Sequence, residues 1–454
     1  MAQLFRGVLL AREPFRGARL MSSARPMTHL PRGQLYFDPS RSLGHLLRQL
    51  PSGTQYGPLC RRFERAVCEE LGSSHAFVLP HARVAFYYLL QSLNLPPGSE
   101  VLMTPVTIPD ILNVITICQL RPVFVDLAEQ TCNIDCDDLE RRITSNSRVL
   151  LITHLCGFPS NMNRLLQIAE QHGLEIFEDC SQIMGGMVNG QSFGLLGRAG
   201  FFSLTTLKTL STFQGGLVVT NDERLDARLR EFAESLPRRS AISIYKLFVR
   251  DLILYTATNR WIYSKFTHHL VRKIESFAPK LIKKVQHGEI FGSRSLNKEA
   301  VVRKALAPQF FVQYTDAQAA IGLDALKNLR GSNQVRNNLG NKLLKALAKG
   351  PTSLGLPRVS PRDASGCTFW RFPYWIERGE SFMKFLRARG IDTTRTNLLC
   401  LSEEPAFSEW ASPTPNAVQF VNKMVFLPIH INQSDEDMTY IANSVAAWFK
   451  AEGD

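Results

Sequence analysis

Short apolar runs alternate with amphipathic stretches through the first half of the chain. The apolar runs, which predict buried strands, cover 77–79, 100–103, 121–126, 149–153 and the segment that ends at Asp179. The amphipathic stretches, which predict helices, cover 59–71, 110–119, 137–143, 161–172 and 222–236. Strands that alternate with helices in this way indicate βαβ units and a mainly parallel sheet, so we predict an α/β fold.

The second half of the chain is predicted to form a smaller α+β unit. Its predicted helices cover 317–329, 336–348 and 380–389, and its predicted strands lie near 369–376 and at 424–427. At 454 residues the chain is long enough for two domains with sizeable cores. We therefore predict a basic, disordered leader at 1–34, a large domain at 35–235, a helical connector at 236–316 and a small C-terminal domain at 317–454.

The positive charge of the chain is concentrated in two segments. The formal net charge is +13, but residues 1–33 hold six arginines and one acid, and residues 236–304 hold fifteen lysines and arginines against four acids. The rest of the chain is slightly acidic. The basic residues therefore belong to the leader and the connector, and not to the body that the strand pattern predicts.

The composition of the leader leaves its role open. It is rich in arginine and nearly free of acid, which fits an organellar transit peptide and fits equally an upstream segment without a targeting role. Nine scattered cysteines without a C-x-x-C spacing favour reduced thiols over disulfides or a metal site, so we expect a cytoplasmic protein unless the leader directs it to an organelle. No apolar run reaches the roughly 20 residues of a membrane-spanning helix.

Residues 241–285, within the connector, interleave apolar, aromatic and basic side chains. Two interpretations fit this pattern. A helix with an apolar and a basic face can lie on an anionic membrane surface, and the same pattern suits a helical hairpin that packs on the body or at a dimer interface. A nucleic-acid partner is not expected, because no recognised binding motif accompanies the charge.

A single lysine stands out between two predicted strands. Lys208 follows an apolar segment and a group of hydroxyl residues, and Gly215-Gly216 opens the next apolar run. The leucines around Lys208 indicate partial desolvation, which favours the unprotonated amine that Schiff-base chemistry with an aldehyde cofactor requires. Ser203 can donate a hydrogen bond to a phosphate, and the two glycines let the backbone pass close to a bound ring.

A carboxylate is predicted to lie near this lysine. Asp179 ends a buried strand, and ligands of parallel α/β sheets sit outside the carboxyl ends of the strands. A pyridoxal cofactor needs an acid against its ring nitrogen, because the protonated ring is the electron sink of the reaction. An acid at a strand end also often caps a helix, but its pairing with Lys208 favours the cofactor role.

These motifs resemble those of the DegT/DnrJ/StrS-type sugar aminotransferases, which are fold type I enzymes that use pyridoxal 5′-phosphate (PLP). The resemblance covers roughly residues 35 to 450 and rests on the shared order of several motifs: Pro122–Asp126, Asn133–Asp135, His154–Pro159, Glu178–Gln182, Phe202-Ser203 with Lys208, Gly215-Gly216, Gln318–Leu323 and Leu427–His430. It implies a large domain with a mainly parallel, seven-stranded sheet, a smaller α+β domain, and a homodimer with its site at the subunit interface.

The resemblance also implies roles for individual residues. Lys208 would hold PLP, Asp179 would keep the ring nitrogen protonated, Gln182 would contact the ring or its hydroxyl, and Ser203 would contact the phosphate.

Three positions depart from the family pattern. The Ser-Gly-Thr turn that holds the phosphate at a helix N-terminus is replaced by His81-Ala82-Arg83, where Arg83 either supplies charge-assisted bonds to the phosphate or phosphate binding is weakened or lost. Ile108 stands where the family has an aromatic residue on the cofactor ring. Phe311 and Gln313 stand where the family has an Asn and an Arg that reach the neighbouring subunit's cofactor.

The function that the resemblance implies is PLP-dependent transfer of an amino group to a keto-sugar in amino-sugar or polysaccharide biosynthesis. In the family the donor is glutamate and the sugar is nucleotide-linked. The departures at the phosphate site favour an alternative, in which the protein is a catalytically degenerate family member. Such a protein would act as a dimeric scaffold or regulator, and a membrane surface is one setting for it. Dehydration through the same cofactor is disfavoured, because family dehydratases typically replace the lysine that is present here.

Overall fold

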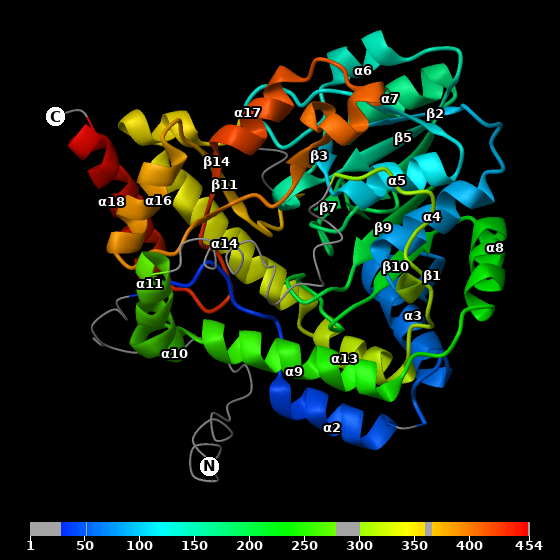
Figure 1. The fold of residues 1–454 in the computed structure, drawn as a ribbon, viewed down its shortest axis with the longest axis horizontal. Helices are drawn as coiled ribbons and strands as arrows, with labels where there is room; N and C mark the ends of the chain where they lie inside the picture. Colours follow the sequence, from blue (N-terminus) through cyan, green and yellow to red (C-terminus); the bar gives the residue numbers. More distant parts are fainter. Residues whose placement is uncertain (1–28, 51, 278–299, 359–365, 453–454) are drawn as a thin grey trace.

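The centre of the molecule is a seven-stranded sheet in the order β1-β10-β9-β6-β5-β2-β4 (Figure 1). The computed structural model describes residues 29–50, 52–277, 300–358 and 366–452. The seven strands are β1 (His75–Leu79), β2 (Glu100–Met103), β4 (Arg121–Phe124), β5 (Ser147–Thr153), β6 (Glu175–Asp179), β9 (Ala199–Ser203) and β10 (Gly216–Thr220). Only β10 runs antiparallel to its neighbours β1 and β9, so the predicted α/β fold with a mainly parallel sheet is confirmed.

Helices cover both faces of this sheet because strand side chains alternate between two apolar cores. In β5, for example, Leu150 and Ile152 enter one core while Val149 and Leu151 enter the other. The first core is closed by α3 (Pro58–Leu71), α6 (Cys136–Arg142), α7 (Met162–His172) and α13 (Asp316–Leu326). The second is closed by α4 (Ala82–Ser92), α5 (Pro109–Ile117) and α8 (Glu223–Glu234).

A separate apolar core lies in the C-terminal part of the chain. It surrounds the antiparallel sheet β11-β14-β12 and the long helices beside it. Its elements are α14 (Leu329–Leu347), β11 (Phe372–Trp375), α16 (Gly379–Ala388), β12 (Thr394–Arg395), α17 (Pro415–Lys423), β14 (Met424–Leu427) and α18 (Asp435–Glu452). Two further pairs are β3 (Val106–Thr107) with β13 (Leu399–Cys400) and β7 (Met187–Val188) with β8 (Gln191–Ser192).

The structure differs from the predicted elements at the junction of these two parts. Helix α13, with which we expected the small domain to begin, packs against α3 of the large-domain core. Helix α14 begins at Leu329, several residues before the predicted start. Gly331 is tolerated inside it because the position that a Cβ would take is open space. The domain boundaries themselves stay predictions.

The connector forms helices that pack on the body. Helix α9 (Ala241–Thr258) buries Ile244 and Phe248 against a cluster that includes Phe213, and it lies beside α2 (Pro39–Gln49) (Figure 1). It continues into α10 (Arg260–Ile262) and α11 (His268–Phe277). This packing agrees with the helical-hairpin interpretation, although residues 278–285 of the predicted segment lie outside the described residues. Among the helices that the structure describes, none is long and apolar enough to cross a membrane.

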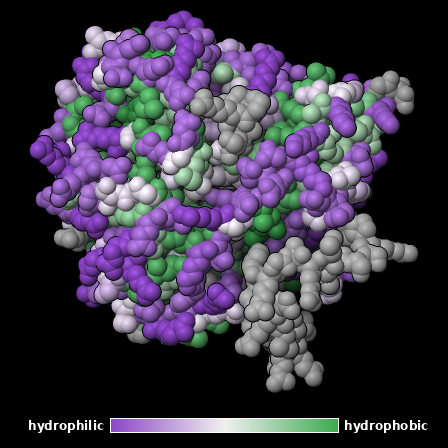
Figure 2. All heavy atoms as spheres, turned by 180° about the vertical axis from the view of Figure 1, so that it is seen from behind, coloured by the Kyte–Doolittle hydropathy of each residue, from purple (hydrophilic) through white to green (hydrophobic). Residues whose placement is uncertain are grey.

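The end of the predicted leader is part of the folded body. Leu30 is 1% exposed and forms a parallel bridge with Ile391, and Arg32 pairs with Asp392 at 2.8 Å. Leu30 and Arg32 of the predicted leader therefore contact the folded body, while residues 1–28 lie outside the described residues. The nine cysteines, all within the described residues, are free thiols. The face of the molecule opposite to the view of Figure 1 is covered mostly by hydrophilic side chains (Figure 2).

Candidate active site

One edge of the central sheet gathers the residues that the sequence singled out. Ser203, at the end of β9, pairs with Gly216 at the start of β10, and Gly216 pairs with Leu79 at the end of β1. Because β10 runs in the opposite direction, its first residue lies among the last residues of its neighbours. Asp179 ends β6, which is parallel to β9. The turn after β1, Ser203 and Asp179 therefore share the carboxyl edge of the sheet, where α/β enzymes bind ligands.

Lys208 lies in the loop between β9 and β10. Its backbone N–H donates to the Thr205 carbonyl at 2.9 Å. Its Nζ lies 4.2 Å from the centroid of the Trp370 ring, and the Trp370 indole donates to the Leu207 carbonyl at 2.9 Å. Burial lowers the pKa of Lys208 to about 8, and the charge of Arg371 adds to this, while Asp179 opposes it. An unprotonated amine is therefore accessible near neutral pH, as the sequence predicted.

Asp179 is buried and electrostatically coupled to Lys208. It is 8% exposed, and its Oδ1 accepts a hydrogen bond from the Ser181 N–H at 3.0 Å. Burial raises the pKa of this carboxyl, and the bonds from Ser181 and the charge of Lys208 oppose the rise. A cationic partner stabilises the charged form of a buried carboxylate, and a protonated ring nitrogen would be such a partner.

Two other predicted residues are held by neighbouring backbone and hydroxyl groups. The Gln182 amide oxygen accepts a hydrogen bond from the Cys156 N–H at 2.7 Å, so the amide is fixed through its oxygen and its NH₂ group is the part that can donate. The Ser203 hydroxyl lies 3.1 Å from the Thr205 hydroxyl. Ser203 is the last residue of β9 and Thr205 follows it, so both hydroxyls lie on the approach to Lys208.

The turn after β1 begins helix α4. Ala82 is the first helical residue and His81 is the N-cap. A Cβ on Gly216 would come within 2.4 Å of the His81 carbonyl carbon, so a glycine is required where β10 passes this turn. Ile108 is the N-cap of α5 and packs on the apolar core beneath α4 and α5.

Arg83 is engaged within the chain. Its guanidinium forms an ion pair with Asp110 in the first turn of α5 and lies 4.6 Å from the centroid of the Phe310 ring. Burial and the nearby charge of Arg303 lower the pKa of Arg83 to about 10. Arg83 thus ties α4 to α5, and its contact with a phosphate stays a prediction.

Sequence reasoning missed three residues of this region. Trp370 and Arg371 come from the C-terminal part of the chain, and no local pattern marks them as neighbours of Lys208. Arg239 belongs to the basic connector but is buried, with only 6% of its surface exposed. Its burial depends on packing between distant segments, so nothing in the local sequence distinguishes it from an ordinary surface charge.

One group of side chains has the residue types of a metal site. His154, Glu178 and Cys180 are buried with their ligand atoms within 4.8 Å of one another. The Glu178 carboxylate accepts hydrogen bonds from the N–H groups of Gly194, Leu196 and Gly197 and lies 3.2 Å from His154 Nε2. These bonds occupy both carboxylate oxygens and give the group a structural role.

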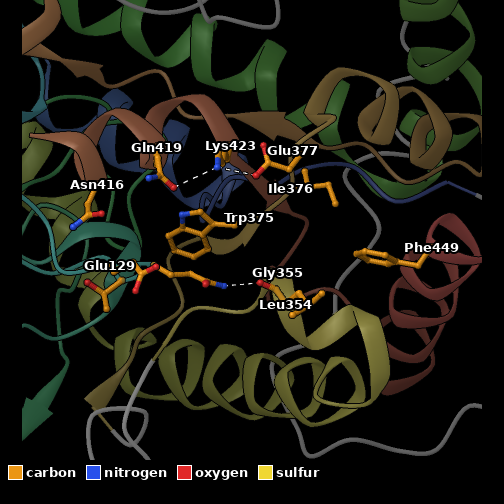
Figure 3. Close-up of a pocket in the computed structure, with 12 residues that line it drawn as sticks. Glu129, Leu354, Gly355, Trp375, Ile376, Glu377, Asn416, Gln419, Lys423 and Phe449 are labelled. Carbon is orange, nitrogen blue, oxygen red and sulfur yellow. Dashed lines mark hydrogen bonds and ion pairs between the residues drawn. The ribbon is translucent and has the colours of Figure 1, made fainter. Parts of the chain in front are cut away.

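A cavity of about 320 Å³ lies in the C-terminal part of the chain, away from these residues (Figure 3). Trp375, Glu129 and Phe449 are among the residues that line it. The polar groups of this cavity largely bond one another: Lys423 pairs with Glu377 at 2.7 Å and donates to Gln419 at 3.3 Å. None of the residues predicted for the site lines this cavity.

The sequence was compared with known protein families. The profile of the DegT/DnrJ/EryC1/StrS aminotransferase family matches residues 45–240 and 278–446. The chain belongs to this family. The match leaves out 241–277, which is the segment that forms α9 to α11.

Relatives and solved structures agree with the family assignment. The chain is 23% identical to the spore coat polysaccharide biosynthesis protein SpsC of Bacillus subtilis over 86% of this chain and 89% of that protein. It is 28% identical to GDP-perosamine synthase of Escherichia coli O157:H7 over 44% of this chain and 53% of that protein. The structure of Helicobacter pylori PseC, an aminotransferase involved in pseudoaminic acid biosynthesis, matches with a TM-score of 0.69 at 18% identity, covering 93% of this chain and all of that one. The comparisons give no support to the scaffold alternative.

The family uses PLP, and the residues at this edge fit that cofactor. The three groups are the Lys208 amine, whose pKa is lowered, the buried Asp179 carboxylate, on which the charge of Lys208 acts, and the buried Arg239 guanidinium. Two nitrogen atoms of Arg239 lack partners in the described part of the chain. Amine, carboxylate and cation are the three groups that the aldehyde, ring nitrogen and phosphate of PLP require.

Proposed function

We propose that this protein is a PLP-dependent aminotransferase that moves an amino group from a small-molecule donor, glutamate, to a keto-sugar. The observation that carries the proposal is the Lys208 amine, of lowered pKa, coupled to the buried carboxylate of Asp179 at the carboxyl edge of the sheet. The donor ends as a keto acid and the keto-sugar as an amino-sugar, so the exchange needs no external oxidant.

The side chains divide the work. When bound, PLP supplies an aldehyde that combines with amines and a protonated ring that withdraws electrons. Lys208 would hold the cofactor, and its free amine would take the proton from the donor's Cα and return a proton to the acceptor carbon. Asp179 would keep the ring nitrogen protonated, Gln182 would donate to the ring hydroxyl, Ser203 would contact the phosphate, and Ile108 would contact the ring.

The names of the relatives support a sugar acceptor. One is a GDP-perosamine synthase and another a protein of spore coat polysaccharide biosynthesis. We therefore propose a nucleotide-linked keto-sugar as the acceptor and amino-sugar or polysaccharide biosynthesis as the setting.

The proposal is tested by trapping the cofactor. The purified chain is incubated with PLP, reduced with borohydride, digested and analysed by mass spectrometry. We expect the pyridoxyl mass on the peptide that contains Lys208, and loss of the cofactor's absorbance band on addition of glutamate. A wild-type protein that captures no PLP, or captures it on other lysines, would refute the proposal.

We also propose a homodimer, as the family resemblance implies. Light scattering on the purified chain should give twice the mass of 51.1 kDa. A monomer at all protein concentrations would contradict it.

Contact of the connector with a membrane surface stays a prediction. Ile242, Val249 and Ile253 are exposed on the side of α9 opposite the buried Ile244 and Phe248. Lys246 lies on the same exposed stripe. We expect sedimentation with phosphatidylserine vesicles, weakened by Ile253→Glu. If the two proteins sedimented equally, or if neither sedimented, α9 would only pack on the body and would not contact a membrane.

A further inference from the structure

Arg239 is a buried arginine without an acidic partner in the described part of the chain. It lies between α8 and α9, where its backbone N–H donates to the Thr54 carbonyl at 3.2 Å. Its Nε and Nη2 atoms are buried and have no hydrogen-bond partner among the described residues. Burial lowers the pKa of Arg239 to about 10, so the group is still charged at neutral pH. A buried charge without a partner is costly to the fold, and an anion bound there would remove that cost.

Residues 310–313 link the segment of Arg239 to the turn that follows β1: the Gln313 N–H donates to the Pro237 carbonyl at 2.8 Å, and the Phe310 ring centroid lies 4.8 Å from that of His81. Burial first, and then the charges of Arg83 and Arg239, hold the pKa of His81 well below its usual value. His81 is the N-cap of α4, and its side chain does not cap the helix. The Ala82 N–H consequently has no hydrogen-bond partner among the described residues. A helix N-terminus and a buried cation thus act on the same place, and both favour a negative charge.

Arg83, the other cation near this turn, is already engaged. Its guanidinium pairs with Asp110, a carboxylate that is 0% exposed and that also faces Arg303 at 3.5 Å. Arg239 has no carboxylate partner in the described part of the chain, and two of its nitrogen atoms have no hydrogen-bond partner there. Of the two arginines whose charges act on His81, Arg239 is therefore the one with donors left for a ligand.

The two positions from which the family reaches the cofactor of a neighbouring subunit are used here for contacts within the chain. Phe311 packs edge-on against Tyr87 with ring centroids 5.9 Å apart. The side-chain oxygen of Gln313 accepts a hydrogen bond from the Tyr56 N–H at 3.2 Å. Neither side chain brings a positive charge to the cofactor of a neighbouring molecule.

We propose that Arg239, together with the N–H groups at the start of α4, binds the phosphate of PLP and supplies from its own chain the positive charge that anchors the cofactor. This inference rests on the function proposed above. The turn after β1 shares the sheet edge with Ser203 and Asp179, so an anion held there lies on the same side of the sheet as the ring-binding carboxylate. A nucleotide-linked sugar also carries phosphoryl groups, and the experiment must separate the two sources.

The test compares PLP with pyridoxal, which lacks the phosphate. The dissociation constants of both are measured by absorbance on the cofactor-free wild type, Arg239→Met, Arg239→Lys and Arg238→Met. Arg238 is the matched control, because it is the adjacent arginine and is exposed. We expect Arg239→Met to weaken the binding of PLP about 10- to 100-fold, which is the usual contribution of a hydrogen bond to a charged group. The binding of pyridoxal should be unchanged. Arg239→Lys should retain part of the preference, and Arg238→Met all of it.

Thermal unfolding supplies a second readout. Because Met removes a buried charge without a partner, cofactor-free Arg239→Met should melt at the wild-type temperature or above it. The rise in melting temperature that PLP causes in the wild type should shrink. A merely structural arginine would show the opposite pattern, a lower melting temperature without cofactor.

Three outcomes would overturn the inference. In the first, Arg239→Met weakens PLP and pyridoxal equally. In the second, it weakens neither. In the third, GDP or UDP protects the wild type against unfolding, this protection is lost in Arg239→Met, and PLP binding is unchanged, which would assign Arg239 to the nucleotide. Failure of the proposed function looks different: the wild type itself would capture no PLP on Lys208 under borohydride.

Discussion

The two halves of the site differ in how far they follow the family pattern. The lysine half keeps Lys208 and Asp179, which the structure couples electrostatically. The phosphate half has exchanged its turn for His81-Ala82-Arg83 and has a buried arginine, Arg239, beside it. The proton transfers and the ring contact need particular groups in particular places, whereas a phosphate needs only charge and N–H donors. Different residues can meet the second requirement, so that half can change while the chemistry is kept.

The lysine half also has a support outside the family match. Asp251 and Arg250 of α9 hold the loop that carries Lys208: the Thr206 hydroxyl donates to Asp251 at 3.0 Å, and Arg250 donates to the Phe213 carbonyl at 2.9 Å. Asp251 and Arg250 also pair with each other, and the Asp251 side chain is 1% exposed. The loop that carries Lys208 is thus held by a segment that the family profile does not match.

Replacing Lys208 should have the largest effect on the comparison. Lys208→Ala should lower transamination by about 10³-fold or more, because it removes both the attachment point and the proton carrier. The measurement is the single-turnover rate with glutamate, and Lys246→Ala, at an exposed position of α9, is the control. A wild-type rate in Lys208→Ala would show that Lys208 does not carry the reaction.

Replacing Asp179 tests the ring contact. Asp179→Asn keeps the size of the side chain but removes the charge that protonates the ring, so we expect a rate loss of about 10²- to 10³-fold with PLP still bound through its phosphate. Rates and PLP dissociation constants are measured on the same samples. If the affinity fell as far as the rate, Asp179 would serve binding in general and not the reaction.

The support of the Lys208 loop by α9 predicts a change in stability. Asp251→Asn breaks a buried ion pair and should lower the free energy of unfolding by about 3 kcal/mol, measured by urea denaturation without cofactor. Asp435→Asn is the control, since the Asp435 side chain is 65% exposed in its pair with Lys342. Equal stability of the two variants would mean that α9 does not support the lysine loop.

The pH dependence of cofactor capture reports on the coupling within the lysine half. Only the unprotonated amine reacts, and the pKa of Lys208 is lowered to about 8, so the capture rate should rise about tenfold per pH unit below pH 8 and then level off. Asp179 raises this pKa, so the midpoint in Asp179→Asn should move to lower pH. A wild-type midpoint near the ordinary value of 10.5 would contradict the burial of the amine.

Restoring an aromatic residue should have the smallest effect. Ile108→Tyr offers a ring to the face of the cofactor and should tighten PLP by about two- to tenfold, the range of a single aromatic contact. Pyridoxal should gain by the same factor, because the contact does not involve the phosphate. A gain confined to PLP would place residue 108 in the phosphate half.

Local patterns predicted the parts of the molecule that local forces determine. The apolar run before Asp179 and the glycines after Lys208 predicted β6 and the start of β10, because burial and close backbone approach leave a direct mark on sequence. Lys208 and Asp179 were predicted as site residues in this way. The position of Trp370 over the lysine was not, because it depends on how the C-terminal part packs on the loop.

The phosphate half was predicted less well for the same reason. Arg83 carried the expected charge, but its partner Asp110 lies on another helix, and the sequence does not show that the pair neutralises it. Arg239 and Arg238 are adjacent and chemically identical, yet one is buried and the other exposed. Only the arrangement of the segments around them separates the two.

The antiparallel strand β10 has a consequence for the order in which the chain becomes functional. β1 pairs only with β10 in the sheet, and His75 meets Thr220. At usual translation speeds, β10 leaves the ribosome roughly 7 to 30 seconds after β1. During that interval the turn that begins α4 has no neighbouring strand and the loop of Lys208 does not yet exist. The nascent chain therefore cannot bind its cofactor before β10 has been synthesised. Until then the apolar edge of β1 stays exposed to chaperones.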